Sequence, residues 1–292
     1  MSAVNPSIPI ELPARRVRDH VLARLLRQPA AVVSGIAVVL IILATVGAPL
    51  IAPYSPRESD FTQLFAQPSW KHLLGTDEIG RDLLSRILYG GRTSLIVATF
   101  ATVISMIVGI AWGFVAALRE GWIGEILMRI ADAAMGMPVI LLGLVLVAAF
   151  GASTLSLILI LGSLFAPATA RLARSTLLAE LRSEYHLAAV SVGASRTRIV
   201  LTELLPNTLP VLLARASLVA ADAIFVEASL SFVGLGVQPP DASWGTLLQQ
   251  GYTNLYRSYW YPIFPGLVIL VAVLALNTLG DNVQRALDPS RS

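Results

Sequence analysis

Three ionisable side chains interrupt the otherwise apolar segment 208–230. Arg215 and Asp222 are seven residues apart, so they lie on nearly the same face of a helix, whereas Glu227 lies about 120° round from Arg215. Ionisable residues inside apolar helices of this length are costly, face a bundle interior or a water-filled cavity, and often mark a pathway for a solute or ion. These three residues therefore predict either an ion pair to a neighbouring helix or the lining of such a path. Glu227 has a third alternative, the stabilisation of a segment outside the membrane.

Other reactive residue types form no recognisable catalytic or metal site. The chain has no cysteine, and its three histidines, His20, His72 and His186, lie on separate segments without a second ligand at metal-binding spacing. Its only lysine is Lys71, which lies outside any Gly-x4-Gly-Lys-Ser/Thr phosphate loop. A Gly-x-Ser-x-Gly hydrolase motif is also absent from the sequence. The sequence therefore predicts no enzyme activity, no metal and no cofactor for this chain.

Composition places the protein in the membrane class. Of its 292 residues, 55% are hydrophobic and only 13% are charged, with a mean hydropathy of +0.73, whereas soluble domains carry about 25% charged residues. This excludes a soluble globular protein. The formal net charge of +3 is too small an excess to indicate nucleic-acid binding.

Long apolar windows predict an all-α protein with six transmembrane helices. A bilayer core of about 30 Å requires about 20 apolar residues in a helix. One charge-free window is too long for a single span, and the turn-forming run Gly151–Thr154 divides it into two. For the segment with the three ionisable residues, a buried or interfacial helix is the alternative to a span. The predicted spans are 30–51, 93–118, 130–150, 155–176, 208–230 and 259–279.

The distribution of arginine predicts the orientation. Fourteen of the 21 basic residues fall on the cytoplasmic side when both termini lie there. They are in 1–29, between the second and third spans, in 171–207, which includes the loop 177–207 and Arg171 and Arg174 at the end of the fourth span, and in 282–292. The external loop 52–91 is unusually basic for that side. The first span is expected to remain as a membrane anchor. Residues 1–29 are either a basic amphipathic helix on the inner membrane surface or a disordered basic tail.

The long cytoplasmic loop has the pattern helix, turn, helix. Ala188 and Ala189 offer a small surface to another helix, and Gly193 permits a backbone conformation that other residues resist. The second helix is expected to stop at Pro206. This compact elbow favours a docking surface for a partner protein, with an ordinary surface helix pair as the alternative.

The spacing in this loop resembles the EAA loop of ABC importer permeases. Ala188-Ala189 is followed after three residues by Gly193 and after nine more by Glu203-Leu204-Leu205-Pro206. Leu187 departs from the pattern where an acidic residue is common, and Glu203 where the subfamily commonly has histidine. The resemblance implies that the ATPase-coupling residues are Glu184, Ala188, Ala189, Gly193, Ala194, Glu203, Leu205 and Pro206.

Further motifs narrow the resemblance to the C-type permease subunit of dipeptide, oligopeptide and nickel importers. The resemblance extends from about residue 74 to 289. The motifs are Leu74–Asp82, Gly91–Leu95, Glu227–Gly236, Ser243–Gly245, Pro265-Gly266, Asn277–Asp281 and Ala286–Pro289.

The resemblance implies a type I importer permease in the plasma or inner membrane, spanning it several times. Such a chain forms half of a translocation path, pairs with a homologous B-type permease, and contacts membrane lipid. Two ABC ATPase domains bind ATP and Mg, and an extracytoplasmic solute-binding protein delivers the cargo. Di- and oligopeptides are the expected cargo, with nickel or another small solute as the alternative. A proton-coupled transporter using Asp222 and Glu227, or a structural subunit, are the competing classes.

Candidate path or gate residues complete the prediction. Met135, Met137 and Pro138 fall in the third span, where Pro138 is expected to kink the helix. Core packing is the default for these residues, and a role facing the path is the alternative, for which Met137 and Pro138 are the candidates. The aromatic segment 231–261 indicates a membrane interface or a gate that meets the binding protein. Trp244 belongs to this segment and joins the candidates Arg215, Asp222 and Glu227.

Overall fold

The structure, a computed structural model, describes residues 24–119, 121–182 and 196–287. This described part is all-helical and contains no β-strand. Most of the predicted basic tail, and the centre of the predicted coupling loop, lie outside the described residues.

Five helices are long and apolar enough to cross a membrane, and a bent pair supplies a sixth span. The prediction of an all-α membrane protein with six spans is confirmed in this form. The single helices are α2 (Pro29–Val46), α4 (Leu83–Leu118), α7 (Thr154–Glu180), α10 (Leu205–Phe232) and α12 (Trp260–Leu287), and the pair is α5 (Trp122–Met135) with α6 (Val139–Phe150).

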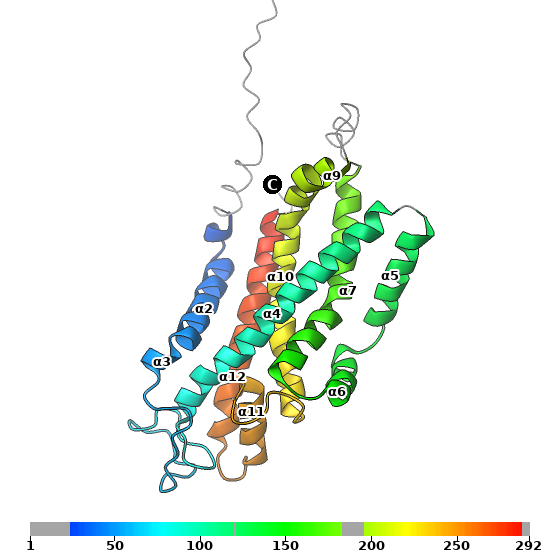
Figure 1. The fold of residues 1–292 in the computed structure, drawn as a ribbon. Coiled ribbons are helices and arrows are strands. Elements are labelled where there is room, and N and C mark those ends of the chain that lie inside the picture. The colour runs from blue at the N-terminus through cyan, green and yellow to red at the C-terminus, as the bar shows by residue number, and fades with distance from the viewer. Residues whose placement is uncertain (1–23, 120, 183–195, 288–292) are drawn as a thin grey trace, which may run out of the picture.

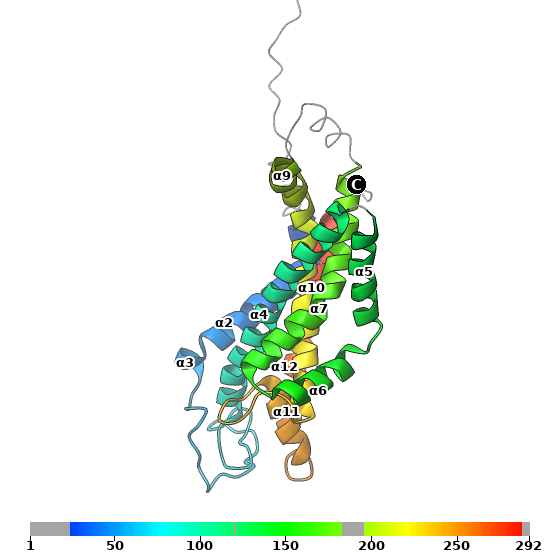
Figure 2. The same ribbon diagram turned by 45° about the vertical axis from the view of Figure 1, so that its right-hand side comes forward.

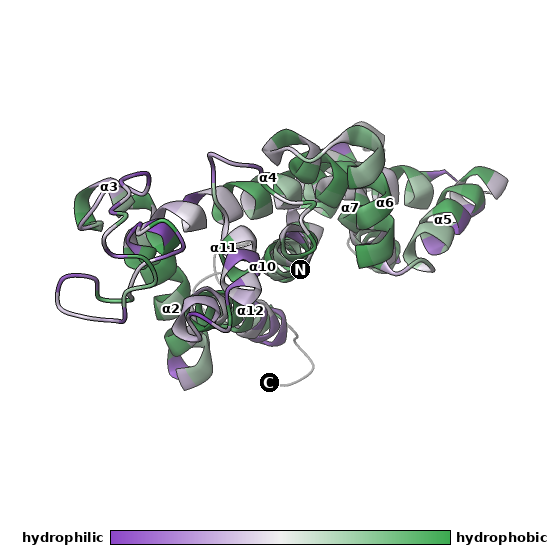
Figure 3. Ribbon diagram, turned by 90° about the horizontal axis from the view of Figure 1, so that it is seen from below, coloured by the Kyte–Doolittle hydropathy of each residue, from purple (hydrophilic) through white to green (hydrophobic). Residues whose placement is uncertain are grey.

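Different segments of the chain lie at the two ends of the bundle. The start of α2, the end of α12 and the short helix α9 (Arg196–Ile199) lie at one end, and α3 (Ala48–Ile51), the segment 52–82 and α11 (Trp244–Thr253) lie at the other (Figure 1). This arrangement agrees with the predicted orientation, in which both terminal segments lie on the cytoplasmic side. Viewed from the external end, hydrophobic residues cover most of the spanning helices, while α5 carries a hydrophilic side (Figure 3).

The predicted third span, 130–150, is wrong as a single helix. α5 begins at Trp122, ends at Met135 and meets α6 at an angle of 90° (Figure 2). Each of the two is only about 20 Å long at 1.5 Å per residue, too short to cross a bilayer core alone. Pro138 caps α6 and lacks the N–H that would continue the preceding helix. The predicted kink is therefore a complete break.

α4 begins at Leu83, within the predicted external loop, rather than at residue 93. Asp82 is its N-cap: its carboxylate accepts hydrogen bonds from the backbone N–H and the hydroxyl of Ser85, both at 2.8 Å. The helix has 36 residues and is about 54 Å long. It therefore exceeds the bilayer core and projects outside, where Arg86 and Arg92 do not have to enter lipid.

The expectation that a helix stops at Pro206 is also wrong. The chain continues from α9 through a π-helical turn, Val200–Leu204, directly into α10, and Pro206 lies in the first turn of α10. The N–H of Leu205 bonds to the carbonyl of Val200, five residues back. Because the turn is widened at this point, the missing N–H of Pro206 does not interrupt the helical path.

Small residues bring α4 and α7 together, and this pair has the most extensive packing in the described chain. A Cβ atom on Gly113 would lie 2.4 Å from the carbonyl oxygen of Ala170, and one on Gly109 would lie 2.6 Å from Thr169 Cβ. Such close approach of backbones is how membrane helices gain van der Waals contact without a hydrophobic driving force. The α4–α7 pair is therefore the rigid centre of the bundle.

We expect Gly113→Val to destabilise the purified chain by about 1–3 kcal/mol, because the added side chain would force the two helices apart. Thermal unfolding in detergent measures the loss. Gly35→Val is the matched control, since nothing lies within 4 Å of a Cβ atom at that helical position. Equal unfolding temperatures for the two variants would contradict the close packing of α4 on α7.

Candidate translocation site and coupling loop

A buried carboxylate organises the external end of the protein. Asp77 Oδ2 lies 2.6 Å from Arg81 Nε and 2.5 Å from an Arg86 guanidinium nitrogen, and its Oδ1 accepts the backbone N–H of Ile79 at 3.0 Å and of Arg81 at 2.9 Å. The same Arg86 nitrogen donates to the hydroxyl oxygen of Tyr261 at 3.2 Å. The hydrogen bonds to the Asp77 carboxylate are charge-assisted and therefore strong, and through Arg86 they join the start of α4 to the start of α12.

The segment before α4 folds back on itself through turns at two glycines. Gly75 and Gly80 have φ angles of +82° and +80°, a region that glycine enters without strain. A Cβ on Gly80 would lie 1.9 Å from the carbonyl oxygen of Asp60. His72 Nδ1 lies 3.0 Å from the Asp82 carboxylate, which also caps α4. The motif Leu74–Asp82 therefore fixes segment 52–82 onto the outer end of α4.

Glu227 and Trp244 form a second buried junction, between α4, α10 and α11. Glu227 is fully buried and accepts hydrogen bonds from Ser94 at 3.1 Å and Ser231 at 2.7 Å. Ser94 in turn accepts the backbone N–H of Trp244 at 3.1 Å, and the Trp244 indole donates to the carbonyl of Ile87 at 3.0 Å. The carboxylate thus holds the first turn of α11 through a shared serine.

Both residues lie inside the chain and not on an open surface. Of the alternatives for Glu227, these hydrogen bonds favour the one in which it stabilises an external segment, because α11 is the segment they hold. A role of Glu227 and Trp244 at a gate stays a prediction, and it would require α11 to move relative to α10. Gly245 limits that movement in the present state, since a Cβ there would lie 2.6 Å from Ala228 Cα.

A groove of about 480 Å³ lies towards the cytoplasmic end. Arg215 faces it from α10, and Arg171 from α7. Arg171 pairs with Asp132 of α5 at 2.9 Å, whereas Arg215 has no ion pair within 4 Å among the described residues and only a longer-range attraction to half-buried Asp222. The groove is lined by Met135, Ala168, Arg171, Leu172, Ser175, Val211, Arg215, Leu218 and Gln284.

Of the three residues singled out on the broken span, one lines the groove and two lie outside its lining. Met135, at the end of α5, lines the groove. Met137 and Pro138 are exposed at the break but are not part of its lining. The structure therefore brings together Met135 and Arg215, which the sequence predicted separately, and leaves Met137 and Pro138 on an adjoining surface.

The structure describes the end of the predicted coupling loop, from Arg196 onward, where the chain leads back into the membrane-spanning helix α10. Glu203 falls in the π-helical turn, and Leu205 and Pro206 begin α10. Leu204 is fully buried in a cluster with Leu177 of α7 and Phe114 of α4. Glu184, Ala188, Ala189, Gly193 and Ala194 lie outside the described residues, so their coupling role stays a prediction.

Sequence reasoning missed α11 and the Asp77 cluster. A helix signal was present for α11: Ser243 is its N-cap, and Thr246, three residues on, completes a capping box. Asp82 and Ser85 gave the same kind of signal for the start of α4. The bond of Arg86 to Tyr261, which ties the Asp77 cluster to α12, had no such signal, because it joins residues 175 positions apart.

Comparison with known proteins identifies the family. Residues 109–292 match the family described as binding-protein-dependent transport system inner membrane component. The chain belongs to this family. Residues 18–68 match the N-terminal transmembrane domain of oligopeptide transport permease C. The protein is therefore a transport permease of the inner membrane that crosses the bilayer several times, and not a catalytic enzyme.

Curated relatives align with nearly the whole permease. The chain is 39% identical to a di/tripeptide transport system permease protein DppC of Pseudomonas aeruginosa, over 86% of this chain and 84% of the relative. It is 38% identical to a putative peptide transport system permease protein of Brucella abortus, over 96% of this chain and 92% of that one.

The solved inward-facing MetNI methionine ABC transporter shares the fold. The match has a TM-score of 0.58 at 21% identity and covers 70% of this permease and 96% of the solved chain. It confirms the predicted type I importer permease fold.

We expect Glu227→Leu to destabilise the permease by about 1–3 kcal/mol, because the hydroxyls of Ser94 and Ser231 lose their buried acceptor. Glu227→Gln keeps one acceptor oxygen and is expected to lose less. Thermal unfolding gives the size of the effect, and hydrogen exchange locates it: amides of α11 should exchange faster while those of α5 do not change. Unchanged exchange in α11 would refute the link between Glu227 and that helix.

Proposed function

We propose that this permease forms half of the translocation path of an ATP-driven, binding-protein-dependent importer of di- and oligopeptides. Its proposed partners are a homologous B-type permease, two ABC ATPase domains that bind ATP and Mg, and an extracytoplasmic solute-binding protein. Family membership supports the importer class over a proton-coupled transporter. The relatives named as di/tripeptide and peptide transport permeases support peptide cargo.

One structural feature carries the coupling mechanism: the helical path from α9 to the end of α10 is unbroken. It runs from Arg196, within the predicted coupling loop, to Phe232 at the external end. Arg215 and Glu227 both lie on this continuous helix. Arg215 faces the groove, and Glu227 is linked to α11 through hydrogen bonds. A movement of the loop by the ATPases is therefore transmitted along a single rod to both places. ATP drives the cycle only because it has a higher affinity for one state of the ATPases than for the other.

The groove around Arg215 is our candidate for the cytoplasmic part of the path. An arginine without a close ion pair is strongly disfavoured against lipid, so the face that carries it belongs towards water or the second permease. Arg171 is neutralised by Asp132, which leaves Arg215 as the groove's uncompensated charge among the described lining residues. A guanidinium there matches the C-terminal carboxylate of a peptide.

Arg215→Gln is expected to lower peptide uptake about tenfold, the effect of losing one charge-assisted hydrogen bond to the carboxylate. Arg215→Lys keeps the charge and should retain most of the uptake. Uptake of labelled peptide into vesicles is measured beside ATP hydrolysis, which should persist in both variants. If Arg215→Gln transports peptide at the normal rate, the groove is not part of the path.

The assembly itself is tested by affinity purification of the tagged permease in mild detergent. We expect a second permease and a P-loop ATPase in the purified complex, with ATP hydrolysis stimulated by a peptide-loaded binding protein. Uptake should continue when the proton gradient is collapsed and stop when ATP is withdrawn. Recovery of the permease without an ATPase, together with uptake that follows the proton gradient, would refute the proposal.

A further inference from the structure

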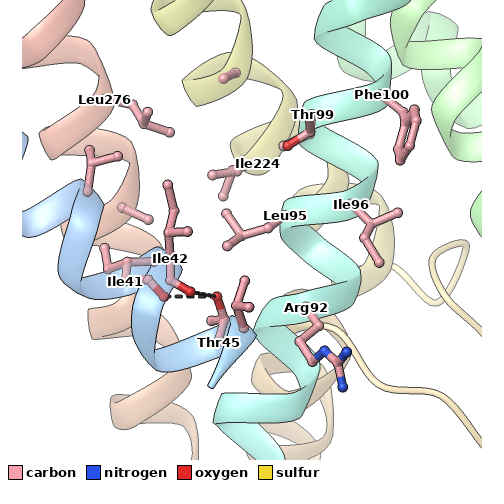
Figure 4. A pocket seen from close by; sticks show the side chains of 15 residues that line it. Ile41, Ile42, Thr45, Arg92, Leu95, Ile96, Thr99, Phe100, Ile224 and Leu276 are labelled. Atoms are coloured by element: carbon pink, nitrogen blue, oxygen red, sulfur yellow. Dashed lines mark hydrogen bonds between the residues drawn. The ribbon is translucent and has the colours of Figure 1, made fainter. Parts of the chain in front are cut away.

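An apolar groove of about 400 Å³ separates α2 from α4, with α10 and α12 forming its floor (Figure 4). Its walls are mainly aliphatic, including Ile41 and Ile42 from α2, Leu95 from α4 and Leu276 from α12. The hydroxyl of Thr45 donates to the carbonyl oxygens of its own helix, Ile41 at 2.8 Å and Ile42 at 3.0 Å. This hydroxyl is therefore satisfied by its own helix and leaves the apolar character of the groove unchanged.

A second, polar pocket of about 470 Å³ adjoins the groove at the external side, and both are lined by Arg92 and Ile96. Figure 4 shows Arg92 on α4 at one end of the apolar groove. The polar pocket is also lined by Arg57, Arg81 and Arg86, with Asp241 as its acidic lining residue.

Three of the four arginines that line the polar pocket have a carboxylate partner in the described structure, and one does not. Arg81 and Arg86 are both bound to the buried carboxylate of Asp77. Arg57 lies 3.7 Å from Asp241. Arg92 is exposed and, in the part of the chain that the structure covers, has no ion pair within 4 Å; its guanidinium carbon lies 6.0 Å from the Tyr89 ring centre. The junction of the two pockets therefore carries an uncompensated positive charge.

We propose that an anionic phospholipid of the outer leaflet binds here, with one acyl chain in the apolar groove and its phosphate at Arg92. A continuous site that is aliphatic along its length and cationic at its external mouth has the chemical pattern of such a lipid. Arginine binds phosphate oxygens through charge-assisted hydrogen bonds. The groove lies between spanning helices, where acyl chains are the surrounding solvent.

The positive charge at the mouth of the groove favours an anionic lipid over an apolar helix from a second permease. An acyl chain is flexible and can follow the aliphatic walls of the groove. Filling this space restores the dispersion contacts that an empty gap lacks.

The bound lipid would fix α2 to the bundle. α2 packs more extensively on α12 than on α4, and half of its residues, among them Val39, Leu40 and Leu43, are exposed in the chain by itself. A lipid between α2 and α4 supplies the contact that the protein lacks on that side. The site therefore has a structural role that does not depend on the identity of the transported solute.

The test is native mass spectrometry of the delipidated, detergent-purified transporter complex titrated with phosphatidylglycerol. Arg92→Gln removes the proposed phosphate contact and should weaken binding about tenfold. Ala220→Phe fills the groove and should abolish binding there. Arg257→Gln and Val271→Phe, an external arginine and an α12 residue that do not line either pocket, should bind as the unmodified complex does.

Three other results of this experiment would overturn the proposal. Glycerol phosphate, which has no acyl chain, should not compete with the lipid; if it does, the apolar groove is not part of the site and the proposal fails. Equal loss of lipid in the control variants would show unspecific binding and overturn it. Binding to the separate permease but not to the assembled complex would show that the second permease covers the groove, which also overturns it.

Discussion

The buried carboxylate of Asp77 is the interaction on which the external end of this permease depends. It accepts from Arg81, Arg86 and the backbone of its own turn, and Arg86 extends the network to Tyr261. A buried charge is tolerated only when it is fully paired in this way. Through this network the first turns of α4 and α12 have fixed positions, and α11 is held between them by Trp244 and the Ser94–Glu227 link.

Two grooves of the bundle differ in their charge. One, between α5, α7, α10 and α12, has Arg171, Arg215 and Asp132 around it, while the other, between α2 and α4, is aliphatic with a single arginine at its mouth. Charged groups inside a span are stable only beside water or protein. In the proposed function, the first groove faces the path and a second permease, and the proposed lipid site lies in the other groove.

Rigid and broken elements are combined in one chain. α4 and α7 are locked by backbone contacts at Gly109 and Gly113, and α10 continues without interruption from the cytoplasmic loop to the external end. α5 and α6 instead meet at 90°. In the proposed mechanism, a continuous helix next to a broken span lets a movement of the coupling loop alter the groove near the cytoplasmic end without unfolding the core.

The sequence by itself determined the membrane class, the number of spans, the turn at Gly151–Thr154 and the family motifs, because hydropathy and turn chemistry act over a few neighbouring residues. It also placed Arg215 and Asp222 on one helix face. Tertiary structure alone decided that Glu227 lies inside the chain, that Pro206 is part of a helix, and that Arg86 of the Asp77 cluster bonds to Tyr261. These outcomes depend on how whole helices rotate and pack against each other, and that is set by contacts between residues far apart in the sequence.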